Sequence, residues 1–173
     1  DPLTEMARRH AEDHRPMIAE AKIQYDLGSM EDAALRLQDS LRFHPDYAPA
    51  LSFQCRVLFA QQRESDLIQL AITHGDDIDR YPNYWIAIGD LARSQQHDAE
   101  ATRAYWEATR CDADVRQAWV KFSTSLRRLQ DLTGRLDAET ITAIENRAVQ
   151  LSRLAELKTS MTRRDHPDRR TTI

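Results

Sequence analysis

Two histidines near the start of the chain have the spacing of a shared metal site. His10 and His14 lie one helical turn apart, which lets two imidazoles reach one zinc ion. A zinc site needs further ligands, and Glu12 and Asp13 point off the face that the two histidines share. We therefore predict surface histidines and no bound metal.

The other reactive side chains are not spaced for catalysis either. The carboxylates of Asp76, Asp77 and Asp79 lack the glycine and glutamate spacing of a calcium loop. No glycine-rich phosphate loop occurs. The remaining histidines have no serine, cysteine or acid at a recognisable catalytic spacing: His44, His74, His97 and His166. The sequence therefore predicts a protein that is not an enzyme and needs no cofactor.

Composition narrows the function further. The 24 basic and 28 acidic residues give a formal net charge of −4, which argues against nucleic-acid binding. The sequence contains no run of about 18 apolar residues, so it predicts no membrane span. Cys55 and Cys111 form no Cys-x-x-Cys motif and are expected to be ordinary packing residues. The chain starts Asp-Pro, so we expect a soluble piece that has been processed or excised and has lost any targeting segment. The sequence therefore predicts no particular localisation.

A regular repeat organises the elements that position these side chains, with a period of about 34 residues. One series of residues at this spacing is large and apolar, and a second series, one helical turn later, is small. The large series is Met17, Leu51, Trp85 and Trp119, and the small series is Ala21, Cys55, Gly89 and Ser123. Fixed self-similarity of this kind is the signature of a repeat architecture.

These residues resemble the tetratricopeptide (TPR) family, whose repeat length is about 34 residues. The likeness is clearest over Pro82–Val115, where the signature places hold Trp85, Ile88, Gly89, Ala92, Ala101, Tyr105 and Ala108. The resemblance implies an all-α fold: a right-handed α-solenoid of about four helix–turn–helix repeats with a long C-terminal capping helix. Residues 1–15 are expected to form a leading helix, residues 16–161 the repeat domain, and residues 162–173 a basic tail or linker. The repeats are expected at about 14–47, 48–81, 82–115 and 116–161.

Turn signals predict individual helix ends. Gly28 should stop a helix by permitting a left-handed backbone, and Gly75 should bend or shorten another. Ser29, Asp98 and Asp137 are expected to cap the helices that follow them. The first helix of the fourth unit should end near residue 129, and the stretch 131–134 should lengthen the turn after it.

The resemblance also implies a binding groove. In the family, the first helix of each pair lines the concave side, where an extended peptide or a partner helix lies. The corresponding positions of this chain are Ile18, Lys22, Tyr25, Ser52, Arg56, Phe59, Ile86, Asp90, Arg93, Val120, Thr124 and Arg127. Trp85 is expected to pack against a neighbouring helix and not to bind a ligand.

Cations exceed acids in this set, with only Asp90 to offset Lys22, Arg56, Arg93 and Arg127. Because arginine forks suit carboxylates, we hypothesise a groove for an acidic or carboxylate-ended peptide; the alternative is an ordinary solvated face. The asparagine pair with which some family members clamp a terminal carboxylate is absent, since Lys22 and Arg56 occupy those places.

The predicted function is a non-catalytic protein–protein interaction scaffold, which could form one part of a longer multidomain protein. One alternative is a self-associating module that dimerises through the C-terminal helix, because Leu154 and Leu157 fall beside its main apolar stripe. Another, by analogy alone, is an assembly factor that presents a client polypeptide, as in cytochrome maturation.

Overall fold

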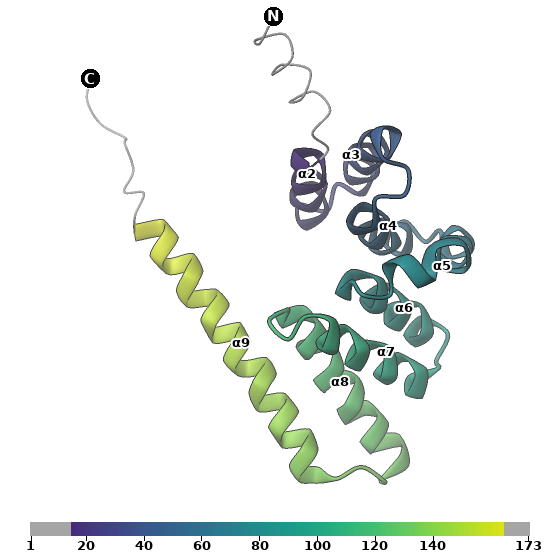
Figure 1. Ribbon diagram of the computed structural model, residues 1–173. Coiled ribbons are helices and arrows are strands. Elements are labelled where there is room, and N and C mark those ends of the chain that lie inside the picture. Colours follow the sequence, from purple (N-terminus) through teal and green to yellow (C-terminus); the bar gives the residue numbers. More distant parts are fainter. Residues whose placement is uncertain (1–14, 165–173) are drawn as a thin grey trace, which may run out of the picture.

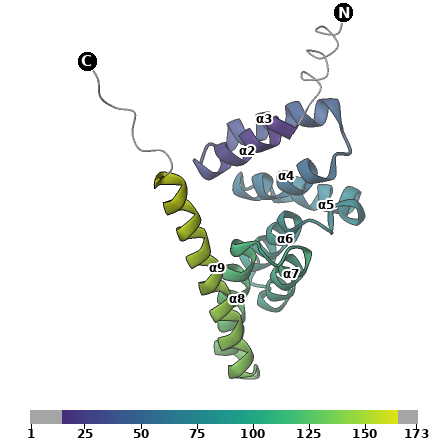
Figure 2. The same cartoon turned by 60° about the vertical axis from the view of Figure 1, so that its left-hand side comes forward.

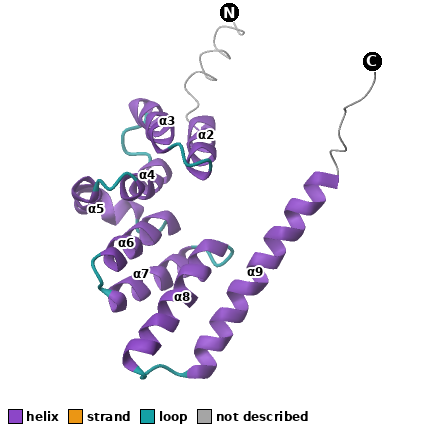
Figure 3. Ribbon diagram, turned by 180° about the vertical axis from the view of Figure 1, so that it is seen from behind, coloured by secondary structure: helices purple, strands orange, loops and turns teal. Residues whose placement is uncertain are grey.

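Helices form all the regular structure in the described part of the chain (Figure 3). The computed structural model describes residues 15–164. No strand occurs among these residues, and the predicted all-α class is confirmed. The helices, in chain order, are α2 (Arg15–Asp26), α3 (Met30–Phe43), α4 (Ala48–Ala60), α5 (Glu64–Ile78), α6 (Pro82–Ser94), α7 (Asp98–Cys111), α8 (Arg116–Thr133) and α9 (Ala138–Arg164).

Consecutive helices pair and the pairs stack in layers (Figure 2). α2 packs on α3, α4 on α5, α6 on α7 and α8 on α9, while the contacts of α3 with α4, α4 with α6 and α7 with α8 join the pairs. The stack is curved, with α2 and α4 on the side toward α9 and with α3 and α5 on the far side (Figure 1). The predicted solenoid with a long final helix is thus confirmed.

Left-handed turn residues recur with the period of the repeat. Gly28 has a φ of 83°, and the Ser29 amide donates to the Gln24 carbonyl at 2.9 Å to close α2. Gln62 and Gln96, which lie one and two repeat lengths further along the chain, have φ values of 59° and 63°. Both residues occupy the strained backbone region that glycine would occupy without cost.

The fourth unit departs from the period because its first helix is longer. The same spacing would place a turn at Gln130, but α8 continues to Thr133 and ends at Gly134, whose φ is 63°. The expected helix end near residue 129 is therefore wrong by about one helical turn.

Helix capping follows the predictions at one of three sites. The Asp137 carboxylate accepts the amides of Glu139 and Thr140, at 3.3 and 3.1 Å, and caps α9 as expected. Ser29 makes no side-chain cap, and its φ of −86° and ψ of 77° lie outside the β region that a capping residue typically adopts. Asp98 lies inside α7, and its carboxylate instead accepts the Arg128 guanidinium at 2.6 Å.

Other predicted features lie elsewhere or outside the described residues. α5 continues past Gly75 to Ile78, so of the two alternatives expected at Gly75, a bend or an early stop, the early stop is wrong. α9 extends to Arg164 and takes in the start of the predicted tail. The leading helix, apart from Arg15, lies outside the described residues, as do His10, His14, His166 and the rest of the tail.

The core is a series of apolar clusters between successive layers. The ring of Tyr105, on α7, is fully buried directly over Gly89 of α6. A Cβ at Gly89 would lie 2.5 Å from Tyr105 Cε1, so only glycine fits there. Gly89 therefore makes room for Tyr105, and Trp85 of the same helix is only half-buried.

Candidate functional site

Three of the predicted groove positions are buried. Ile18, Ser52 and Ile86 occupy the same place in successive repeats and are 7%, 1% and 0% exposed. They pack into the core between layers, since the first helices are turned so that the position after the large residue meets a neighbouring helix. Ile86, for example, clusters with Ala108 of α7 and Ala118 of α8. The expectation that these three residues line an accessible surface is wrong.

The other predicted residues remain accessible and define what we call the inner face. Five of them are exposed, namely Lys22, Arg93, Val120, Thr124 and Arg127. Four are half-buried, namely Tyr25, Arg56, Phe59 and Asp90. Their role in binding is a prediction that we take up below.

Cations stack on aromatic rings where α2 meets α4. The Tyr25 and Phe53 rings pack edge to face with centroids 5.3 Å apart. The Arg56 guanidinium lies 5.0 Å from the Tyr25 centroid, and Lys22 Nζ lies 5.9 Å from that of Phe53. Such contacts hold a cation in place while leaving its charge uncompensated.

Asn83 of α6 is the second group that orients the Arg56 guanidinium. Its Oδ1 accepts a hydrogen bond from Arg56 Nη1 at 3.2 Å, which links α4 to α6. Arg56 Nε is buried and donates to no described atom. The guanidinium is thus oriented by a ring and an amide and has no carboxylate partner among the described residues. Sequence reasoning missed Phe53 and Asn83, because neither lies at a predicted groove position.

Asp90 is held by side chains of α7 and α8, and Arg93 also interacts with the Tyr105 hydroxyl that Asp90 accepts from. Asp90 Oδ1 accepts from the Tyr105 hydroxyl at 2.6 Å and from Lys121 Nζ at 2.6 Å. Burial, followed by the hydrogen bond to Asp90, raises the pKa of Tyr105 above its usual range. This group joins α6, α7 and α8, so Asp90 serves the packing of three helices. The 34-residue spacing of the repeat gives no indication that Asp90 contacts Lys121.

Arg127 is also engaged within the chain. Its Nε and Nη2 donate to the two carboxylate oxygens of Glu145 at 2.9 and 2.8 Å, joining α8 to α9. Three inner-face cations therefore remain without a carboxylate partner in the described part of the chain: Lys22 of α2, Arg56 of α4 and Arg93 of α6.

A hollow of about 640 Å³ extends the inner face at its C-terminal end. It lies between α8 and α9, with Val120 and Ser123 on one side and Ala148, Val149 and Ser152 on the other. Its volume is in the range of ligand sites. Both Val120 and Val149 are exposed, and the charged residues Glu145, Arg153 and Glu156 also line the hollow, so its surface is mixed.

The described residues contain no cluster of histidine, cysteine, aspartate or glutamate that could hold a metal ion. Within the same residues, no helix is long and apolar enough to cross a membrane. His44 and His97 are exposed and His74 is half-buried, each on a different connection or helix.

The paired, stacked helices define a TPR-like α-solenoid. No protein-family profile and no curated protein matches the chain. Solved structures do match, among them "MamA 41-end from Desulfovibrio magneticus RS-1", with a TM-score of 0.54 and 15% identity, covering 87% of this chain and 82% of that one.

Two further structures are similar to the chain. "MamA RS-1 ArsTM double mutant" has a TM-score of 0.55 and 15% identity over 88% of this chain and 83% of that one. A structure titled "Crystal structure of MamA" has a TM-score of 0.52 and 14% identity over 88% and 86% of the two chains. At this identity, the likeness shows a shared fold.

Proposed function

We propose that the chain is a non-catalytic interaction module whose inner face binds an acidic segment of another protein. One observation carries the proposal: Lys22, Arg56 and Arg93 occupy corresponding faces of three successive first helices without a carboxylate partner among the described residues. A ligand carboxylate can form charge-assisted hydrogen bonds with such cations.

The geometry of the stack favours an extended ligand. Packed helices lie about 8–10 Å apart, and α4 packs directly on α6. A polyproline II chain has three residues per turn and rises about 3.1 Å per residue, so every third side chain recurs on one face after about 9 Å. Acidic residues three apart in such a ligand would meet Arg56 and Arg93 in turn.

A binding role suits these side chains better than catalysis. Arg56 is held by stacking on Tyr25 and by a hydrogen bond to Asn83. Asp90 and Arg127 are held by ion pairs to Lys121 and Glu145. None of these contacts pairs a nucleophile with a base, which is the arrangement that covalent catalysis requires.

Fluorescence anisotropy with two labelled peptides tests the proposal. The first contains four repeats of Glu-Pro-Ser, and the second has glutamine in place of each glutamate. We expect the acidic peptide to bind and the neutral peptide to bind at least roughly tenfold more weakly, since each charged hydrogen bond contributes about 1.5–3 kcal/mol. Added salt should weaken binding.

Arg56→Ala and Arg93→Ala should each lower the affinity for the acidic peptide by roughly tenfold. The matched control is Arg42→Ala, because Arg42 is exposed on α3 and its ion-pair partner among the described residues is Asp39 of its own helix. Affinity that is indifferent both to peptide charge and to the two inner-face substitutions would refute the proposal.

The exposed end of α9 favours self-association as a second candidate function. Leu154, Leu157 and Met161 are 50%, 58% and 64% exposed. These residues lie at i, i+3 and i+7 on one face of the helix, beside the stripe that packs on α8. An apolar face of this kind is typical of a helix that packs against a partner.

A further inference from the structure

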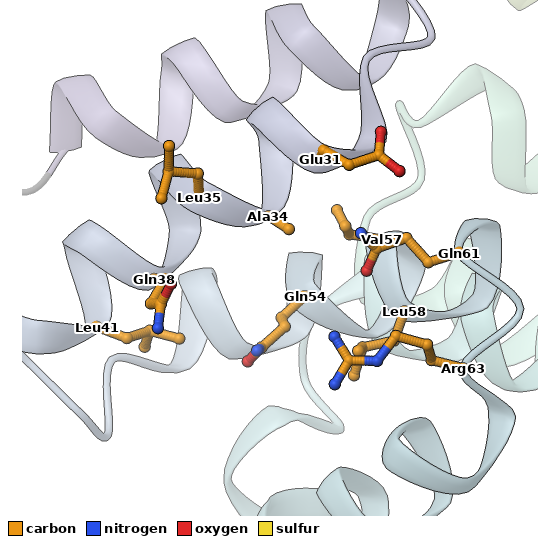
Figure 4. Close-up of a pocket in the computed structure, with 10 residues that line it drawn as sticks. All are labelled: Glu31, Ala34, Leu35, Gln38, Leu41, Gln54, Val57, Leu58, Gln61 and Arg63. Atoms are coloured by element: carbon orange, nitrogen blue, oxygen red, sulfur yellow. The ribbon is translucent and has the colours of Figure 1, made fainter.

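The outer side of the stack carries two adjoining hollows that the inner face does not share. The first, of about 440 Å³, lies between α3 and α4 and is lined by Ala34, Leu35 and Leu41 of α3 and by Val57 and Leu58 of α4, which Figure 4 labels. The second, of about 270 Å³, continues toward Leu70 of α5. They share Gln54, Leu58 and Arg63, so together they form one outer groove along α4.

Hydrogen-bond acceptors line the first hollow. Gln61 Oε1 is buried and accepts from no described donor, and Figure 4 shows the Gln61 amide turned into the hollow. Glu31 stands at its edge without an ion pair among the described residues. The only cation of the hollow, Arg63, is bound by Asp66 at 2.7 Å. A buried acceptor without a donor is costly, so the occupant should supply donors or positive charge.

The end of α9 has the complementary chemistry. Its apolar residues Leu154, Leu157 and Met161 are flanked by the basic residues Arg153 and Lys158, with one acidic residue, Glu156, between them. The three apolar residues follow the i, i+3, i+7 pattern by which an amphipathic helix anchors in a groove. They span two turns of helix, or about 10 Å, and the groove runs along α4 from Gln54 to Gln61, also about 10 Å.

We propose that the C-terminal half of α9 from one copy docks in the outer groove of a second copy. This inference rests on the self-association suggested above and names the surface that receives α9. Leu154, Leu157 and Met161 fill the apolar floor, while Arg153 meets Glu31. In Figure 1, the C-terminal end of α9 stands apart from the stacked helices, while the outer groove is lined by α3, α4 and α5.

Because the two surfaces differ, the contact is heterologous. When two copies bind in this way, one α9 end and one outer groove remain free to contact further copies. Such an interface produces a ring or an open chain of copies, whereas pairing of α9 with α9 would stop at a symmetric dimer. The two forms of self-association therefore differ in stoichiometry.

Analytical ultracentrifugation of complementary variants tests the inference. A groove variant, Glu31→Lys/Leu35→Lys, and a helix variant, Leu154→Glu/Leu157→Glu, alter only exposed residues, so both should fold. We expect the unaltered chain to grow beyond a dimer with concentration, each variant alone to remain monomeric, and their equimolar mixture to form a heterodimer and nothing larger. Controls are Ile72→Lys and Leu132→Glu, which alter exposed apolar residues outside both surfaces.

Two results would overturn the inference. A groove variant that still dimerises, together with a helix variant that does not, would show that α9 pairs with α9 and that the outer groove is not the receptor. A chain that stays monomeric at high concentration would contradict self-association itself.

Discussion

Two tryptophans fasten the loops that precede their helices. Trp119 Nε1 donates to the Ala113 carbonyl at 2.9 Å, and Trp85 Nε1 donates to the Asp79 carbonyl. The acceptors, like the donors, lie one repeat length apart. In the first two units, Met17 and Leu51 occupy the corresponding places and cannot donate. In the third and fourth units, the large residue of the repeat thus holds the preceding loop through a hydrogen bond as well as filling space.

Removing this hydrogen bond should lower stability. We expect Trp85→Phe and Trp119→Phe each to reduce the free energy of unfolding by up to about 1 kcal/mol, because the loop carbonyl loses one of its two donors, the other being Cys111 Sγ at Asp79 and Arg147 Nη2 at Ala113. Trp106→Phe is the control, since Trp106 is exposed and its indole nitrogen donates to no described atom. Urea unfolding measures all three, and an equal effect at Trp106 would contradict this role for the indole.

Relief of left-handed strain should raise stability. Gln62 and Gln96 adopt the conformation that Gly28 adopts in the first unit. Gln62→Gly and Gln96→Gly should each stabilise the fold by up to about 1 kcal/mol. Gln38→Gly, in the interior of α3, should instead destabilise by about 1 kcal/mol. Thermal melts compare them, and a loss of stability at residues 62 and 96 would contradict the strain.

Alkali should destabilise the fold through a buried thiol. Burial raises the pKa of Cys55 to about 12, from its usual value of about 8.5. The folded state therefore holds this proton more tightly, and the stability it contributes is present below about pH 8.5 and is lost as the pH rises toward 12. Between about pH 8 and 10, Cys55→Ala should lose less unfolding free energy than the unaltered chain. Equal losses in urea titrations would contradict this.

At the scale of elements, the start of α9 depends on one carboxylate. Asp137→Ala removes the acceptor for two backbone amides and should lower the melting temperature. Ser29→Ala should leave it unchanged, because that hydroxyl makes no cap at α3. Hydrogen bonds from the Thr140 hydroxyl and amide also lower the pKa of Asp137, so the cap should persist at neutral pH and weaken only in acid. Equal effects of the two substitutions would show that the cap bonds are unimportant.

The helices were predictable because each carries the period of the repeat. The longer α8 was not, since Gly134 signals a stop but nothing local indicates that Gln130 stays helical. Periodicity also placed Lys22, Arg56 and Arg93 on an accessible face. It failed for Ile18, Ser52 and Ile86, which are buried. Adjacent residues of a helix point about 100° apart, and the angle at which helices pack decides which of the two is buried.

Partners far apart in the sequence could not be predicted. Asp90 meets Lys121 and Arg127 meets Glu145 only because α8 packs on α7 and α9 on α8. These two contacts changed which charged residues of the inner face are available to a ligand, since they engage Asp90 and Arg127 within the chain.

At the scale of the whole molecule, the solenoid presents two surfaces of opposite chemistry. The inner face carries the cations Lys22, Arg56 and Arg93, while the outer groove carries the acceptors Glu31 and Gln61 above an apolar floor. Stacked helical pairs expose broad surfaces on both sides. One copy could therefore hold an acidic partner on the inner side while its outer side contacts another copy.

Mapping the acidic peptide on the folded chain tests the central claim most directly. Backbone amide chemical shifts would be recorded by NMR while the Glu-Pro-Ser peptide is added, with the glutamine peptide as control. We predict shifts concentrated on α2, α4 and α6 around Lys22, Arg56 and Arg93, and none with the glutamine peptide. Shifts centred on α3 and α5, or none with the acidic peptide, would contradict the assignment of the inner face as the binding surface.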